Sequence, residues 1–220
     1  MHFEVPKAGL KTAKEFLGEY SMIVVSILTA LALEHAAQSW HHKHRAHDAE
    51  QKIEAELRFN LKELQQATDA NKKQLAHLRL MRTTLRDDIK GKTPDKELVD
   101  NLMKASNNRF GLNLQTPTLR REAWEVAMAS QAASWMSTDL LQRYSALYAQ
   151  QRDTTAAAAT NTQLTMNGPH MLNTMADLEL GKVDPAALYH TLRQMESTID
   201  GVQDNLMQLE TQMREALAKA

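Results

Sequence analysis

Histidine is concentrated in one short stretch of the chain. Five of the nine His residues fall between His35 and His47. On a helix, side chains three or four residues apart share a face, so His41, His44, His47 and Asp48 have a spacing that could hold zinc, nickel or copper. The same imidazoles also suit a polar collar just outside a membrane, and they titrate near pH 6.5, which would allow pH sensing. On the sequence these readings stay open.

No other residue pattern indicates catalysis. The 220 residues include no Cys, which excludes disulfides, thiolate chemistry and Cys-ligated zinc. The chain has no His-Glu-x-x-His pair, no glycine-rich phosphate loop and no Gly-x-Ser-x-Gly elbow. Lys plus Arg number 26 and Asp plus Glu 27, so there is no basic excess to hold a nucleic acid. We therefore expect no enzymatic activity, no cofactor and no nucleic-acid partner.

An apolar run near the N-terminus has the character of a membrane anchor. Residues 22–33 are almost entirely apolar, and Tyr20 and Trp40 stand on either side of the run. Twenty helical residues rise about 30 Å, the thickness of the hydrocarbon core, and aromatic residues gather at both membrane interfaces. The sequence predicts an N-terminal amphipathic segment over residues 1–19 and a transmembrane helix over residues 20–40. A buried helix of a soluble bundle and a cleaved secretory signal are the alternatives.

The predicted span carries one carboxylate. Glu34 lies inside the edge of the hydrocarbon, where its charge costs about 2–3 kcal/mol unless it snorkels, is protonated or meets a partner. Ser26 and Ala30 lie four residues apart, a spacing of small residues that lets helices approach closely in lipid. We expect Ser26, Ala30 and Glu34 to form a contact between copies of the chain. The flanking cations do not decide the orientation, and we expect a cytoplasmic N-terminus with residues 41–220 in the periplasm.

Two later segments carry apolar residues at alternating spacings of four and three, the repeat of helical bundles and coiled coils. Asn71 is a polar member of the first stripe, where it could fix register or oligomer state. Residues 58–92 carry a net charge of +5 and residues 177–215 a net charge of −5, which favours pairing of the two helices. The heptad positions of the two stripes are Leu57, Leu64, Asn71 and Leu78, and Leu192, Ile199, Leu206 and Met213.

Helix-breaking residues divide the chain between these two stripes. Gly91 ends the first long helix, and residues 107–117 form the longest predicted loop. A helix is predicted over 119–136, followed by another. Gly181 is a helix C-terminal stop, and Asp184 followed by a proline caps the start of the last helix.

Two sequence stretches resemble a widespread group of small uncharacterised bacterial proteins. The first is Phe16-Leu17-Gly18-Glu19 with the apolar run, Glu34, Trp40 and Glu56-Leu57-x-x-Asn60. The second runs from Thr118-Leu-Arg-Arg-Glu-Ala-Trp124 through Met136-x-x-Asp139-Leu140 to Tyr144 and Tyr148. Members have one N-terminal membrane helix and an Ala-Trp-containing helical domain, without an assigned activity. The resemblance implies a membrane helix, and a core containing Trp124 and Tyr144.

Together these observations predict an all-α fold in which a single N-terminal transmembrane helix continues into an elongated antiparallel helical bundle or coiled coil over residues 41–220. The predicted function is a non-enzymatic, membrane-anchored scaffold or interaction protein of the bacterial inner membrane. Its expected partners are the lipid bilayer and either further copies of itself or other subunits of a membrane complex. The alternatives are an accessory subunit and a bundle that senses a ligand or metal through a partner. A polar cavity near Trp124, Trp135 and Tyr148 would favour ligand sensing.

Overall fold

The computed structural model describes residues 13–107, 111, 113–166 and 169–218. In these residues every regular element is a helix, as the composition predicts. The elements are α1 (Ala13–Gly91), α2 (Asp95–Ala105), α3 (Glu122–Ala129), the 3-10 helix η1 (Ala132–Trp135), α4 (Thr138–Met166), α5 (Pro169–Glu179) and α6 (Pro185–Ala218).

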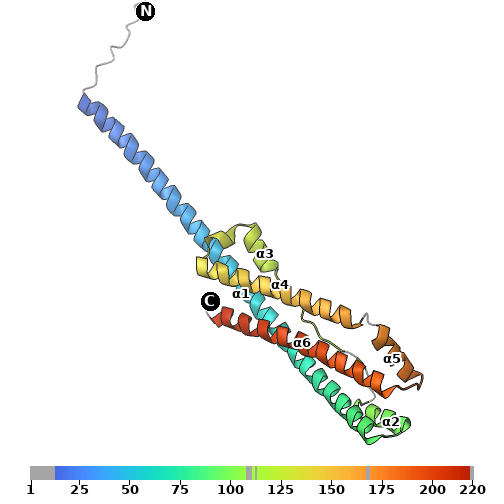
Figure 1. Ribbon diagram of the computed structural model, residues 1–220. Coiled ribbons are helices and arrows are strands. Elements are labelled where there is room, and N and C mark those ends of the chain that lie inside the picture. Colours follow the sequence, from blue (N-terminus) through green and yellow to red (C-terminus); the bar gives the residue numbers. More distant parts are fainter. Residues whose placement is uncertain (1–12, 108–110, 112, 167–168, 219–220) are drawn as a thin grey trace, which may run out of the picture.

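Helix α1 has two parts with different surroundings. It is 79 residues long, or roughly 120 Å at 1.5 Å per residue. Its N-terminal part projects alone from the rest of the molecule, whereas its C-terminal part packs against the other helices (Figure 1). From Phe16 to Trp40 the large apolar side chains are 54–67 % exposed, except Val24, which is half-buried. We call residues 16–40 the apolar N-terminal segment. Among the described residues, α1 is the one helix long and apolar enough to cross a membrane, and its apolar window is not buried.

Helix α1 has no break at the predicted domain boundaries between residues 19 and 20 and between residues 40 and 41. Residues 1–12 of the predicted amphipathic segment lie outside the described residues. From residue 13 onward, α1 runs without interruption through residues 20–40 and into the bundle. The bundle is therefore held on a continuous helix rather than on a hinge.

The bundle consists of the C-terminal part of α1 together with α4 and α6. Helix α4 runs in the same direction as α1, because Tyr148 contacts Glu56 and Gln151 contacts Asn60. Helix α6 returns antiparallel to both and ends beside the middle of α1 (Figure 1). Helix α2 folds back on the far end of α1, and α3 with η1 packs at the end nearest the apolar N-terminal segment.

Both predicted stripes form the core of this bundle. The eight predicted heptad residues are all buried, each at most 2 % exposed. The stripe on α1 faces α6 of the same chain, so the repeat is satisfied within one molecule. Ion pairs follow the predicted charge complementarity. Arg79 lies 3.2 Å from Glu196 and 3.0 Å from Asp200, and Arg82 also pairs with Glu196.

Local sequence signals place several helix ends as predicted. Gly181 has a φ of +71°, and the amides of Gly181 and Lys182 bond back to α5, which ends that helix. Asp184 accepts hydrogen bonds from the amides of Ala186 and Ala187 at the start of α6. The end of α1 differs from expectation in one detail. The left-handed residue is Lys92, with a φ of +56°, rather than Gly91.

The predicted helix over 119–136 is shorter and interrupted in the structure. Residues 113–121 form no helix or strand, α3 begins only at Glu122, and Gln131, with a φ of +61°, separates α3 from η1. Residues 113–121 run back along α1 towards the apolar N-terminal segment. Side chains of α1 bind the backbone of this segment, and these long-range hydrogen bonds override the local helical preference.

Candidate functional site

A buried polar cluster joins α1, α4 and the start of α3. Glu56 on α1 is only 9 % exposed, yet it is fully partnered. One carboxylate oxygen accepts a hydrogen bond from the Tyr148 hydroxyl at 2.6 Å, and the other accepts from the Ala123 amide at 2.8 Å. Ala123 lies in the first turn of α3, where backbone amides have no partner within the helix. Glu56 therefore caps α3 from a distance of 67 residues along the sequence.

Asn60, one turn further along α1, binds the backbone next to this cap. Its Oδ1 accepts from the Arg120 amide at 2.8 Å, and its Nδ2 donates to the Arg120 carbonyl at 2.7 Å. Gln151 of α4 donates to the same carbonyl at 2.9 Å. We call the side chains of Glu56, Asn60, Tyr148 and Gln151 the polar clamp. All four are buried, and the groups named here have partners, as buried polar atoms require.

The same arrangement recurs three turns further along α1. Asn71 Oδ1 accepts from the Gln115 amide, and Asn71 Nδ2 donates to the Gln115 carbonyl, both at 2.8 Å. Asn71 lies eleven positions after Asn60 on α1, a rise of about 16 Å, and Gln115 and Arg120 are five positions apart, which an extended chain covers in about the same length. The distance between the two asparagines along α1 therefore matches the distance between the two backbone positions that they bind. We call residues 113–121 the crossover segment, and Asn71 fixes its register on α1 within the chain.

Burial shifts the acidity of two tyrosines on adjacent turns of α4. Burial raises the pKa of Tyr144 to about 12, and the nearby carboxylates of Glu50 and Glu54 act in the same direction. The pKa of Tyr148 is also raised, first by burial and then by its hydrogen bond to Glu56. The Tyr144 hydroxyl, unlike that of Tyr148, has no hydrogen-bond partner among the described residues.

The predicted metal ligands do not come together. His44 lies 3.7 Å from Asp48, and its ring stacks on Trp40. His47 instead contacts Gln51 at 3.0 Å. In the part of the chain that the structure describes, no three His, Asp or Glu side chains form a group able to hold a metal ion. On one helix, His41, His44 and His47 point progressively around the axis, and no second element brings a further ligand to them.

The predicted contact residues of the span are exposed in the single chain. Ser26 and Glu34 find partners on their own helix, because the Ser26 hydroxyl donates to the Met22 carbonyl and Glu34 accepts from Gln38. Ala30 is exposed beside them. The polar groups of this face therefore do not require a second chain, although the face remains open to one.

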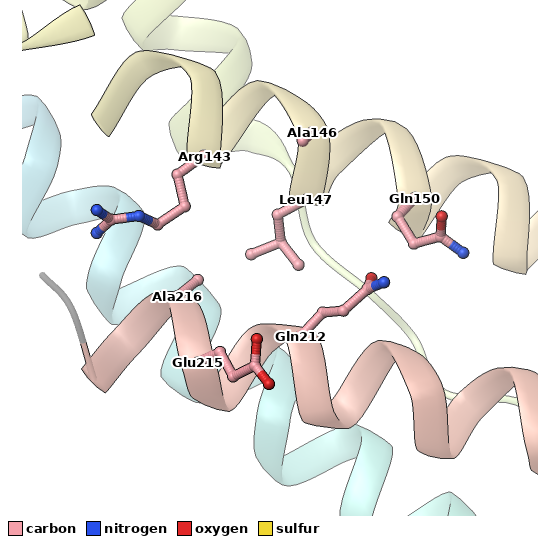
Figure 2. Close-up of a pocket in the computed structure, with 7 residues that line it drawn as sticks. All are labelled: Arg143, Ala146, Leu147, Gln150, Gln212, Glu215 and Ala216. Carbon is pink, nitrogen blue, oxygen red and sulfur yellow. The ribbon is translucent and has the colours of Figure 1, made fainter. Parts of the chain in front are cut away.

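The pockets along the described part of the bundle include the following three. A groove of about 290 Å³ separates the start of α4 from the end of α6 and includes Arg143, Leu147 and Glu215 (Figure 2). A pocket of about 620 Å³ lies between α1 and α3, with Arg45 and Lys52 in its wall. The third, of about 630 Å³, is lined mainly by small Ala and Thr side chains of α4.

None of these three pockets is lined by Trp124, Trp135 or Tyr148 themselves, although the pocket between α1 and α3 is lined by Ala123, next to Trp124, and by Ala132 of η1. Trp124 stacks on Tyr148 with 5.4 Å between ring centroids and is partly buried against the core. Trp135 lies apart from them on η1, where it stacks on His42. Neither Glu56 nor Tyr148 lines a pocket described above, and the two carboxylate oxygens of Glu56 bind the Tyr148 hydroxyl and the start of α3.

The two motif stretches that carry the family resemblance meet in the polar clamp. Glu56 and Asn60 come from the first stretch, and Arg120, Ala123 and Tyr148 from the second. Sequence reasoning missed Gln151 and the role of both asparagines. The sequence signal for these roles was that Asn60 and Asn71 lie on the same face of α1 among apolar residues. No family model, curated protein or solved structure matches the chain.

Proposed function

We propose that the protein is a non-enzymatic, single-pass membrane protein whose helical bundle serves as a scaffold or interaction module. One observation carries the proposal. The apolar N-terminal segment is uncovered, although the rest of the same helix is the central element of a well-packed bundle. An exposed apolar surface of this size is unfavourable in water and marks a membrane or protein interface. Its length and its flanking aromatic residues suit a bilayer.

The proposed cellular place is the bacterial inner membrane, with residues 41–220 in the periplasm. The absence of Cys in the sequence fits either side of the membrane. Because α1 is continuous, the bundle would stand at a fixed distance from the lipid. A module of this kind presents its surface to partners without needing a catalytic group.

Membrane insertion is tested by extraction of cell membranes with alkaline carbonate. Leu28→Arg places a cation near the middle of the segment, which costs about 3 kcal/mol of insertion free energy. We expect the unaltered chain to stay with the membranes and Leu28→Arg to be released in large part. Leu180→Arg, at a 70 % exposed position outside the segment, is the matched control and should stay bound. Complete release of the unaltered chain would refute the anchor.

Self-assembly through the span is the second element of the proposal. The heptad stripes do not support it, because they are used inside one chain. The exposed face with Ser26, Ala30 and Glu34 remains its basis. Native mass after mild extraction should be a whole multiple of 24.8 kDa. Ala30→Leu should lower that mass, whereas Ala32→Leu on the opposite face should not.

An accessory subunit of a larger membrane complex is the alternative. The open groove of small side chains on α4, which includes Ala159 and Thr162, would let another helix approach closely. The same native mass measurement separates the two functions. A mass that includes other chains would replace self-assembly by membership of a complex and would identify the partner.

A further inference from the structure

The end of the bundle nearest the apolar N-terminal segment carries exposed apolar side chains. We call α3 and η1, residues 122–135, the proximal cap. Val126 is 60 % exposed, and Met128 and Trp135 are each 52 % exposed. Exposed large apolar side chains also occur elsewhere on the bundle, as at Leu80, Leu172 and Leu180, but in the cap three of them gather within ten residues of the chain. Its location relative to the apolar N-terminal segment suggests what covers it.

Contacts with α1 fix the height of Trp135. The cap begins beside Glu56, which binds the Ala123 amide. It ends beside His42, because the Trp135 indole stacks on the His42 ring with 3.7 Å between centroids and 11° between planes. Between Ala123 and Trp135 the chain therefore advances about 21 Å along α1 towards the apolar N-terminal segment. His42 follows Trp40 by only two residues, or about 3 Å of helix, so Trp135 lies nearly level with Trp40.

Trp40 marks the edge of the apolar N-terminal segment, where the proposed span meets the headgroups. Indole rings prefer this layer, because their apolar body and their N–H donor suit a boundary between hydrocarbon and water. Trp40 itself is exposed and stacks on His44, one turn further along α1. Two indoles from different elements of the chain are thus held at the depth where tryptophan partitions best.

Charges around the cap are compatible with lipid headgroups. Arg45 is exposed about 8 Å along the helix beyond Trp40, and with Lys52 it lines the pocket between α1 and α3. Asp48 and Glu122 line the same pocket, so the local net charge is small. Trp135 is therefore the main candidate for membrane binding by the cap, rather than a basic patch. Arg45 lies where it can pair with the phosphate of a lipid headgroup.

We propose that the proximal cap docks on the headgroup layer of the bilayer through Trp135, which gives the bundle a second membrane contact beside the span. This inference rests on the proposed function, because it requires α1 to be the anchor. A single helix lets a bundle tilt and rotate over the membrane. A second contact through the cap restricts both motions and fixes which face of the bundle points away from the lipid.

The test uses three full-length variants that each retain one tryptophan, the other two being replaced by Phe. Each is reconstituted in bilayers with or without phospholipid brominated near the top of the acyl chains, which quenches nearby indoles. We expect Trp40 and Trp135 to lose comparable fractions of their fluorescence. Trp124 is the control, because it stacks on Tyr148 about 24 Å along α1 from Trp40 and should keep most of its emission. Circular dichroism checks the fold, and Trp124→Tyr replaces Trp124→Phe if the latter loses helix.

The outcomes separate this inference from the anchor itself. Quenching of Trp40 without quenching of Trp135 would overturn cap docking and leave the span intact. No quenching of Trp40 would refute the anchor on which both proposals rest. Equal quenching of all three tryptophans would place the whole bundle in the lipid and would also overturn docking through the cap. A Trp135 shielded from brominated lipid in the assembled protein would assign the cap to a protein contact instead.

Discussion

The two tyrosines on adjacent turns of α4 allow one substitution to be tested in two environments. Tyr148 donates a 2.6 Å hydrogen bond to the Glu56 carboxylate, whereas the Tyr144 hydroxyl is buried without a partner. Hydrogen bonds to charged groups contribute about 1.5–3 kcal/mol, and a buried polar group without a partner costs about 1–3 kcal/mol. Replacing each tyrosine by phenylalanine removes one oxygen and keeps the ring. The two variants should therefore change stability in opposite directions.

Tyr148→Phe should lower the free energy of unfolding by about 1.5–3 kcal/mol. The Trp124 stacking is kept, and Glu56 retains the Ala123 amide but loses its second partner. Tyr144→Phe should leave stability unchanged or raise it by up to about 1 kcal/mol, since the small void left behind offsets part of the gain. For a chain of this size, Tyr148→Phe should lower the melting temperature by roughly 3–12 °C.

The assay is thermal unfolding of the full-length protein in a mild detergent, followed by near-ultraviolet circular dichroism. The double variant provides an internal check, because the two hydroxyls share no hydrogen-bond partner and their effects should be nearly additive. A loss of similar size in both single variants would refute the reasoning, since it would mean that the bond to Glu56 contributes nothing beyond the presence of the ring.

The same pair predicts a dependence on alkaline pH. Tyr144 has a folded pKa of about 12 and an ordinary value of 10.0. Below pH 10 it is protonated in both folded and unfolded states, so its contribution is complete. Between pH 10 and 12 the unfolded chain releases this proton and the folded chain keeps it, so stability falls by about 1.4 kcal/mol per pH unit. Tyr144→Phe should remove that slope. Parallel pH profiles for the two proteins would contradict the assigned burial.

Three further predictions concern single positions. Asn71→Leu should cost about 2–4 kcal/mol in chemical denaturation, because it leaves both the amide and the carbonyl of Gln115 without their partner; a cost below 1 kcal/mol would show that the crossover segment does not depend on it. Lys92→Gly should stabilise the protein by about 0.5–1 kcal/mol, measured as a higher melting temperature, because glycine adopts the φ of +56° without strain. An unchanged or lower melting temperature would argue against the left-handed cap. Leu206→Asp should unfold the bundle rather than only dissociate an oligomer, because Leu206 is 2 % exposed within its own chain; folded monomers in circular dichroism and native mass would contradict this.

Local patterns in the sequence determine most of the helices. The alternation of four and three over Leu57 to Leu78 and over Leu192 to Met213 predicts buried stripes, because a helix places such residues on one face whatever lies opposite. Gly181 and Asp184 predict helix ends, because the groups that they satisfy are within a few residues. The apolar run over 22–33, together with Tyr20 and Trp40 on either side, predicts a membrane helix but leaves a buried helix of a soluble bundle open, and the structure shows this part of α1 uncovered.

Only the tertiary structure decided what the stripes pack against. A heptad repeat can pack against a helix of the same chain or of a second chain, because it fixes which helix face is apolar and not which helix covers that face. In the structure that partner is the chain's own bundle, so Asn71 fixes the path of a crossover segment and not an oligomer state. The late start of the predicted helix over 119–136 has the same origin. The backbone of Arg120 is bound by Asn60, which is 60 residues away, and helix propensities of a few tenths of a kcal/mol per residue cannot outweigh two part-buried hydrogen bonds.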